Sequence, residues 1–207
     1  MPPSLPARFR LASAVAAGVA AVLALPTAGV ATATRYEFPV RCTGHVSYGH
    51  VHHDYPATDI FAPVGCTFVA PIAGTVDEVS ATDRWNSRTN RGADRGGRSV
   101  SIVGADGVRY YGSHLSAVAA GIRPGVTVTA GQPLGTVGRS GDARGGPSHV
   151  HFGISWPTAP GRWWIRRGEV YPWPYLDAWR AHRDRSPAAA VAARRRQVGD
   201  SPCTKDC

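Results

Sequence analysis

The chain has 207 residues and a formal net charge of +9, from 23 Lys and Arg residues against 14 Asp and Glu residues. Its hydrophobic fraction of 43% is sufficient for a packed core, which excludes a wholly disordered chain. The 24 glycines and 17 prolines are more than a helical bundle accommodates, and they favour a β fold with many turns.

The N-terminal residues 1–33 have the pattern of a secretory signal peptide. Arg8 and Arg10 form a short basic region, and an apolar run follows over residues 11–25. Ala31-Thr32-Ala33 then places small residues before a predicted cleavage site after Ala33. An uncleaved membrane anchor is the alternative, although the apolar run is shorter than the ~20 residues that span a bilayer. We therefore expect an exported protein that is secreted or resides in the cell envelope.

Short strands are predicted along most of residues 34–185, which we take as one domain. The hairpin is the strongest of these signals, because two β-rich runs flank the turn sequence Gly104-Ala105-Asp106-Gly107. The predicted strand segments are 67–79, 98–103, 108–113, 126–137 and 148–155, with breaks at Pro71, Gly74 and Gly131.

The clearest predicted helix covers residues 174–183, where Leu176 and Trp179 have the spacing of a core-facing side. We expect the neighbouring Trp163-Trp164 pair to pack this helix onto the sheet, with sugar binding as the alternative. Residues 186–207 are rich in Pro, Ala and Arg, and we predict a C-terminal tail there, either mobile or a frayed helix.

The chain has four cysteines, Cys42, Cys66, Cys203 and Cys207. An even number in an exported chain suggests two disulfides, for which three pairings exist. The local pairs Cys42–Cys66 and Cys203–Cys207 are the most economical, and a free or intermolecular pair in the tail is the alternative. A four-cysteine zinc site is disfavoured because the chain has no C-x-x-C spacing.

Histidines are the best candidates for chemistry. His149 and His151 are two residues apart on a predicted strand, so their side chains point to the same face. Farther upstream, His53 and Asp59 are close in sequence and are suitable zinc ligands. His114 ends the predicted hairpin. Taken singly, these residues are equally consistent with a solvated strand face, a polar turn and a core histidine, and His45, His50 and His52 are expected in exposed loops.

Together these segments resemble the lysostaphin-type (LytM-like) zinc metallopeptidases, a family of peptidoglycan endopeptidases. The resemblance runs from about residue 45 to residue 157 and keeps the family's order. The matching segments are Asp59-Ile60-Phe61-Ala62-Pro63-Val64-Gly65, Val69 to Val76, Tyr111-Gly112-Ser113-His114-Leu115, Gly131 to Gly141, and Gly146-Pro147-Ser148-His149-Val150-His151-Phe152.

The resemblance implies a mainly β fold, an antiparallel two-layer β-sheet sandwich with a short C-terminal helix. It also implies a Zn²⁺ ion. Asp59 and His151 correspond to zinc ligands, and His114 and His149 correspond to the catalytic histidines.

The first histidine ligand departs from the family pattern, which has a histidine four residues before the aspartate. Tyr55 stands at that position in this chain and cannot serve as the ligand. An insertion of two residues would restore His53, which we take as the expected ligand, with His52 as the alternative.

The function that the resemblance implies is zinc-dependent hydrolysis of stem or bridge peptides in peptidoglycan. A non-catalytic peptidoglycan-binding or hydrolase-regulating protein of the same fold is the alternative. Anionic cell-wall polymers are a second expected partner, because the predicted loop over 84–97 contains Arg84, Arg88, Arg91 and Arg95. The arginines form no helical stripe, so we expect no nucleic-acid partner, and we expect a monomer.

Overall fold

The structure is a computed structural model of the chain, and it describes Met1 and residues 35–199. The predicted signal peptide over 1–33 lies outside the described residues, as do Cys203 and Cys207, so the cleavage site and the second disulfide stay predictions. Within the described residues, no helix is both long enough and apolar enough to cross a membrane.

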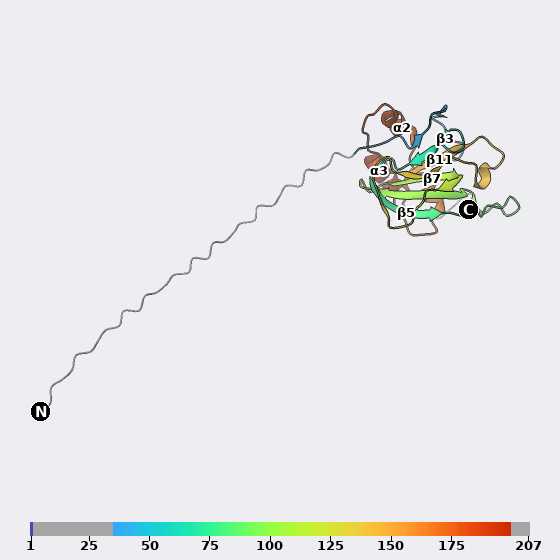
Figure 1. Cartoon of the computed structure of the whole chain (residues 1–207). Coiled ribbons are helices and arrows are strands. Elements are labelled where there is room, and N and C mark those ends of the chain that lie inside the picture. The colour runs from blue at the N-terminus through green and yellow to red at the C-terminus, as the bar shows by residue number, and fades with distance from the viewer. Residues whose placement is uncertain (2–34, 200–207) are drawn as a thin grey trace. The chain divides into compact units, whose positions relative to one another are not determined.

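Two antiparallel sheets form the domain, which agrees with the predicted fold class. The larger sheet has seven strands in the spatial order β2 (Ser47–Tyr48), β3 (Thr58–Phe61), β11 (His149–Ser155), β7 (Arg109–Leu115), β6 (Arg98–Gly104), β5 (Gly74–Ser80) and β9 (Thr127–Val128). The smaller sheet has four strands in the order β1 (Val40–Arg41), β4 (Thr67–Val69), β10 (Pro133–Thr136) and β8 (Ala117–Val118). Figure 1 shows β3, β11, β7 and β5 following one another across the larger sheet.

The strands that alternate in polarity or surround a turn lie where the sequence predicts them. The hairpin is formed by β6 and β7, and residues 67–79 divide into β4 and β5 around the predicted breaks. The structure adds β3, which has four residues, and three segments of only two residues each, β1, β2 and β8. A segment of this length has too few side chains to display a period of two, so the sequence gives no signal for it.

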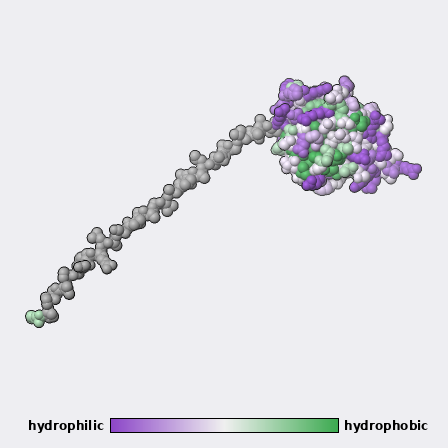
Figure 2. All heavy atoms as spheres, in the orientation of Figure 1, coloured by the Kyte–Doolittle hydropathy of each residue, from purple (hydrophilic) through white to green (hydrophobic). Residues whose placement is uncertain are grey.

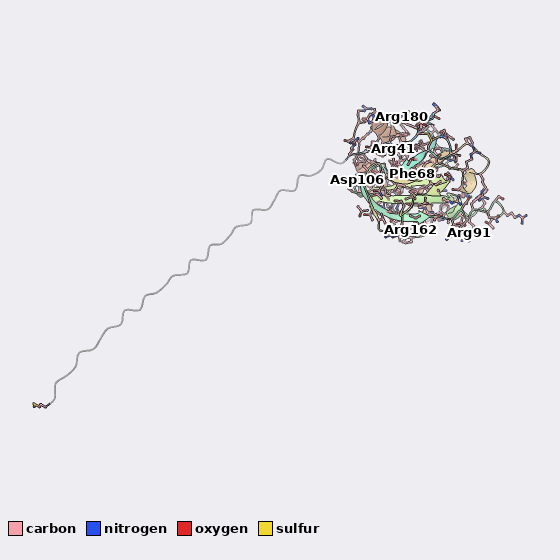
Figure 3. All side chains as sticks on the ribbon, viewed as in Figure 1. Arg41, Phe68, Arg91, Asp106, Arg162 and Arg180 are labelled. Carbon is pink, nitrogen blue, oxygen red and sulfur yellow. A yellow bond between two sulfur atoms is a disulfide. The ribbon has the colours of Figure 1, made fainter. Side chains whose placement is uncertain are left out.

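The main core lies between the two sheets. Phe68 of β4 is buried and faces Gly112 of β7, where an added Cβ atom would come within 2.2 Å of the Phe68 ring. Glycine at this position therefore lets the two sheets approach closely. Figure 3 shows Phe68 in the middle of the domain, between Asp106 and Arg91, which lie toward opposite ends.

Short helices lie outside the sheets. They are the 3₁₀ turns η1 (Gly92–Asp94) and η2 (Gly141–Ala143), and the α-helices α1 (Trp163–Arg166), α2 (Trp173–Arg180) and α3 (Ala188–Val198). In α2, Leu176 and Trp179 are buried as predicted, and the Trp179 ring stacks on Tyr36 with centroids 5.2 Å apart. Pro174 lies in the first turn of α2, where its missing N–H has no hydrogen bond to lose.

The segment predicted as a tail forms an ordered helix in its described part. Val191 of α3 is 4% exposed and belongs to the hydrophobic core, and Arg194 forms an ion pair with Glu169 at 3.3 Å. The sequence Ala-Ala-Ala-Val-Ala-Ala-Arg-Arg-Arg has one large apolar residue, so it displays no apolar stripe. Small alanine side chains, together with Val191 and Arg194, hold the helix on the domain, and the amphipathic pattern that would predict this packing is missing from the sequence.

Replacing Val191 by aspartate tests whether α3 contributes to stability. The change puts a charge into the core, and we expect the free energy of unfolding to fall by about 2 to 4 kcal/mol. Ala193→Asp is the matched control, because Ala193 is exposed on the same helix. Thermal unfolding of both variants measures the difference, and equal unfolding temperatures would show that α3 does not stabilise the domain.

A disulfide joins Cys42 to Cys66, whose Cα atoms lie 5.0 Å apart. It confirms the local pairing expected from the sequence. The loop that it closes contains β2 and β3 together with the chain between them.

Candidate metal and catalytic centre

The register of three neighbouring strands brings His151 beside Asp59. His151 of β11 pairs with Asp59 of β3 on one side and with Ser113 of β7 on the other. His149 lies two residues earlier on the same face of β11, whereas Val150 between them is fully buried on the opposite face. The structure thus brings together the His-x-His pair and the aspartate that the sequence singled out.

A hydrogen bond to one backbone carbonyl fixes the orientation of the His151 ring. Its Nε2 atom lies 2.8 Å from the carbonyl oxygen of Arg167, which can only accept, so Nε2 carries the hydrogen. In the neutral ring the lone pair is then on Nδ1, which lies 3.0 Å from the carboxylate oxygen Oδ1 of Asp59. A lone pair and a carboxylate oxygen this close repel each other unless a cation, a proton or a metal ion, lies between them.

His52 shows the same arrangement from the other side of Asp59. Its Nδ1 atom donates to the carbonyl oxygen of Tyr55 at 3.1 Å, and its Nε2 atom faces Asp59 Oδ1 at 3.8 Å. The His52 side chain is 3% exposed. Two imidazole nitrogens with free lone pairs, one from His52 and one from His151, therefore face the same carboxylate oxygen.

His53 lies at the edge of this group. Its side chain is 73% exposed, and its Nδ1 atom lies 3.3 Å from the Asp54 carboxylate. Nevertheless, a ring nitrogen of His52, a ring nitrogen of His53 and a carboxylate oxygen of Asp59 all lie within 4.8 Å of one another. Both histidines are therefore within reach of a metal, but His52 has the carbonyl partner that orients a ligand ring, and the expected ligand His53 has none among its described contacts.

The other two histidines face each other beside the group. His149 Nδ1 donates to the carbonyl oxygen of Pro147 at 2.9 Å, and His114 Nδ1 donates to that of Ser140 at 2.8 Å. Their ring centroids lie 4.8 Å apart, and His149 Nε2 lies 3.9 Å from Asp59 Oδ1. Both Nε2 atoms thus remain available to exchange a proton.

The backbone at His114 adopts a left-handed conformation with φ of 63°, which is uncommon for a residue with a side chain. The His114 N–H donates to the Gly96 carbonyl at 2.9 Å, and the Ser140 N–H donates to the His114 carbonyl at 3.3 Å. These bonds connect the end of β7 to the loops on either side. Such conformations concentrate at functional sites, where surrounding contacts hold them in place.

Burial sets the protonation states of the centre. It lowers the pKa of His114 to about 3 and the pKa of His52 to about 4, so both rings are neutral at pH 7. Burial alone would raise the pKa of Asp59, but the close approach of the His151 ring and the nearby histidines outweigh it and hold that pKa well below its usual value. An ionised carboxylate beside neutral imidazoles is the state in which these groups bind a metal.

A cleft of about 140 Å³ opens beside the centre. Its walls include His114 and His151 together with residues that sequence reasoning missed, namely Tyr55, Asp142, Arg166 and Arg167. Burial raises the pKa of Asp142, whose carboxylate lies 3.9 Å from His114 Nε2.

The hydrophilic loop between β5 and β6, which includes η1, projects from the body of the domain next to this cleft (Figures 1 and 2). Arg95 of that loop lines the cleft, whereas Arg84, Arg88 and Arg91 do not.

One signal in the sequence could have pointed to the wall formed by Arg166 and Arg167. Gly168 follows them with φ of 145°, and an added Cβ atom there would lie 2.2 Å from the carbonyl oxygen of Pro56. An added Cβ atom on Gly153 of β11 would lie 2.4 Å from the Arg167 carbonyl oxygen. These two glycines let the chain after α1 lie directly against β11 and the turn before β3.

Residues 53–161 match the family model described as peptidase family M23, which covers more than half of the chain. The chain belongs to peptidase family M23. Among curated proteins, the L-Ala--D-Glu endopeptidase of Bacillus subtilis (strain 168) is 31% identical over 130 residues. That alignment spans 60% of this chain and 35% of the relative, so the chain corresponds to about a third of the relative's length.

Solved structures agree with this family assignment at the level of the fold. The antimicrobial peptidase lysostaphin from Staphylococcus simulans superposes with a TM-score of 0.52 at 20% identity, over 74% of this chain and 58% of lysostaphin. A protein from Ruminococcus gnavus ATCC 29149, provisionally assigned as a glycyl-glycine endopeptidase lytM, superposes with a TM-score of 0.56 at 23% identity. That superposition covers 72% of this chain and 62% of the other chain.

Proposed function

We propose that this M23 peptidase is an exported, zinc-dependent endopeptidase that hydrolyses stem or bridge peptides of bacterial peptidoglycan. One observation supports it most strongly. The free nitrogens of His52 and His151 converge on a single oxygen of Asp59, next to a pair of histidines that face each other. Membership of a peptidase family and the similarity to a peptidoglycan endopeptidase supply the substrate class.

The donor set fits zinc. Neutral imidazole nitrogens and a carboxylate oxygen are ordinary Zn²⁺ ligands, and three protein ligands are typical of catalytic sites, which keep a fourth position open. We assign His52, Asp59 and His151 as these ligands, with His53 as the alternative to His52. When bound, the zinc ion would act as a Lewis acid that makes water a better nucleophile and polarises the peptide carbonyl.

The remaining histidines then handle the protons. His114 is neutral at pH 7, so its free Nε2 can accept the proton of the attacking water. His149 is the second candidate, because its Nε2 lies 3.9 Å from the Asp59 carboxylate. The ring that has gained a proton can donate a hydrogen bond to the oxygen of the former carbonyl and then protonate the leaving amine. Carbonyl hydrogen bonds at both Nδ1 atoms keep the two Nε2 atoms directed at the reacting groups.

The alternative, a non-catalytic protein of the same fold, would be expected to lack one or more of these groups. Every residue type that the mechanism needs is present and directed at the centre in this chain. The proposal therefore includes catalysis, and it keeps the exported location, the monomeric state and binding of anionic wall polymers as further parts to be tested.

Digestion of purified peptidoglycan tests the proposed function. We expect the folded domain to release soluble peptides, whose masses identify the bond that is cut. Treatment with a chelator should stop release, and added Zn²⁺ should restore it, because the water is activated at the metal. The double variant His114→Ala/His149→Ala serves as the control preparation. Intact peptidoglycan after incubation with zinc-loaded wild-type protein would contradict the proposal.

A further inference from the structure

Arg167 is a charged group in the cleft that forms no ion pair within the described part of the chain, and Glu169, the carboxylate that it influences electrostatically, is ion-paired with Arg194 instead. Its guanidinium carbon lies 4.1 Å from the centre of the Tyr55 ring and 5.1 Å from that of Trp163. Its Nε atom is buried and has no hydrogen-bond partner. The guanidinium thus lies against two aromatic rings, while its Nε–H is unused.

Neighbouring arginines are used differently. Arg166 forms an ion pair with Glu78 and lies 5.4 Å from the Tyr111 ring, so a partner within the fold neutralises it. Arg95, on the opposite wall, donates from Nε to the side chain of Asn90 at 3.3 Å. The acidic residues of the cleft are Asp54, which lies beside His53, and Asp142, which lies beside His114. The ion pairs described for these two carboxylates are with those histidines.

The position of Arg167 relative to the metal ligands is fixed by its own backbone. Its carbonyl oxygen accepts the hydrogen bond from His151, and the carbonyl oxygen of Tyr55 accepts the one from His52. The two residues whose backbones orient the ligand rings therefore stack their side chains on each other. Close packing at Gly153 and Gly168 leaves this segment little freedom to move. The guanidinium is consequently held next to the centre at a set distance.

We propose that Arg167 binds a carboxylate of the substrate, so that the cleft selects peptides with a free carboxylate close to the scissile bond. A planar guanidinium with unused N–H groups binds a carboxylate through two parallel hydrogen bonds, and stacking on aromatic rings orients it beforehand. The inference rests on the proposed function for the identity of the scissile bond. It adds a specificity that the metal ligands and catalytic histidines do not supply.

A binding measurement separates this inference from hydrolysis. The probes are N-acetyl-alanyl-glutamate and N-acetyl-alanyl-glutaminamide, which differ in carrying carboxylates or amides, and the protein is metal-free so that zinc cannot bind the acid. Fluorescence of Trp163, beside Arg167, reports binding. We expect the wild-type protein to bind the acid about 10- to 100-fold more tightly than the amide. Arg167→Gln should abolish that preference, and Arg167→Lys should retain only part of it.

Arg123→Gln is the matched control, because Arg123 is exposed and does not line the cleft. It should keep the preference of the wild type. Circular dichroism and thermal unfolding check that each variant is folded, and if Arg167→Gln fails to fold, Arg167→Lys provides the comparison. Equal affinity of the wild type for both probes, or an unchanged preference in a folded Arg167 variant, would overturn the inference.

A second arm uses a peptide released from peptidoglycan, resynthesised with its acidic residue as carboxylate or carboxamide. The zinc-loaded wild type should show a kcat/KM ratio of acid to amide of about 10 or more, and Arg167→Gln should bring the ratio close to one. Cleavage without preference contradicts the inference alone. An Arg167-dependent preference in binding, without cleavage of any peptidoglycan, supports the inference and contradicts the proposed function.

Discussion

Replacing His52 by alanine is expected to remove bound zinc, whereas replacing His53 by alanine is expected to leave it. His52 is buried, its ring is oriented by the Tyr55 carbonyl, and its free nitrogen faces Asp59. His53 is largely exposed and contacts Asp54. Loss of one of three protein ligands should lower zinc affinity by at least about 100-fold, which exceeds the usual effect of losing an outer-shell partner.

Metal content of the purified, folded variants measures this difference. About one zinc per chain is expected for the wild type and for His53→Ala, and close to none for His52→Ala. The family match begins at residue 53, so the paired variants decide between two assignments that the sequence leaves open. Loss of zinc in His53→Ala alone would assign that residue as the ligand, as the sequence pattern suggested, and would contradict the assignment based on geometry.

Replacing His114 or His149 by alanine is expected to abolish peptidoglycan hydrolysis while the protein keeps its metal. Each ring has one nitrogen bonded to a backbone carbonyl and the other directed at the centre, so each is placed to move a proton. Loss of a general acid or base should lower the rate by about 10²- to 10⁴-fold. Release of soluble peptide from purified peptidoglycan, measured together with zinc content, is the test.

His45→Ala is the matched control for both substitutions, because His45 is an exposed histidine that does not line the cleft. It should retain wild-type activity and zinc. Activity near that of the wild type in His114→Ala or His149→Ala would remove that residue from the mechanism. Loss of zinc together with loss of activity would instead place the residue among the metal ligands.

The part of the centre that lies on strands could be predicted from the sequence because strand geometry is regular. Side chains alternate between faces, so the spacing of His149 and His151 already places both imidazoles together. Asp59 was indicated by the family resemblance alone, because its strand β3 is not among the predicted segments. In the structure β3 pairs with β11, which places Asp59 opposite His151 and buries Val150 and Ile60 on the other face. The regular hairpin of β6 and β7 was predictable for the same reason.

The choice between His52 and His53 could not be made in this way. Both residues lie in an irregular turn before β3, where adjacent side chains follow no fixed period. The outcome depends on a single hydrogen bond to Tyr55 and on packing against a segment more than 100 residues away in sequence. The proposed role of Arg167 in carboxylate binding could not be predicted for a similar reason, because it depends on contacts with Tyr55 that only the folded chain forms.

The disulfide between Cys42 and Cys66 encloses both His52 and Asp59 within one covalent ring. Closing a ring of this size removes about 3 to 4 kcal/mol of chain entropy from the unfolded state in the loop-closure model. A protease that cut the exposed turn near His53 would leave both fragments attached to the domain through the sulfur atoms. The half of the centre that includes His52 and Asp59 is thus tethered at both ends, so a single break in its backbone does not release it.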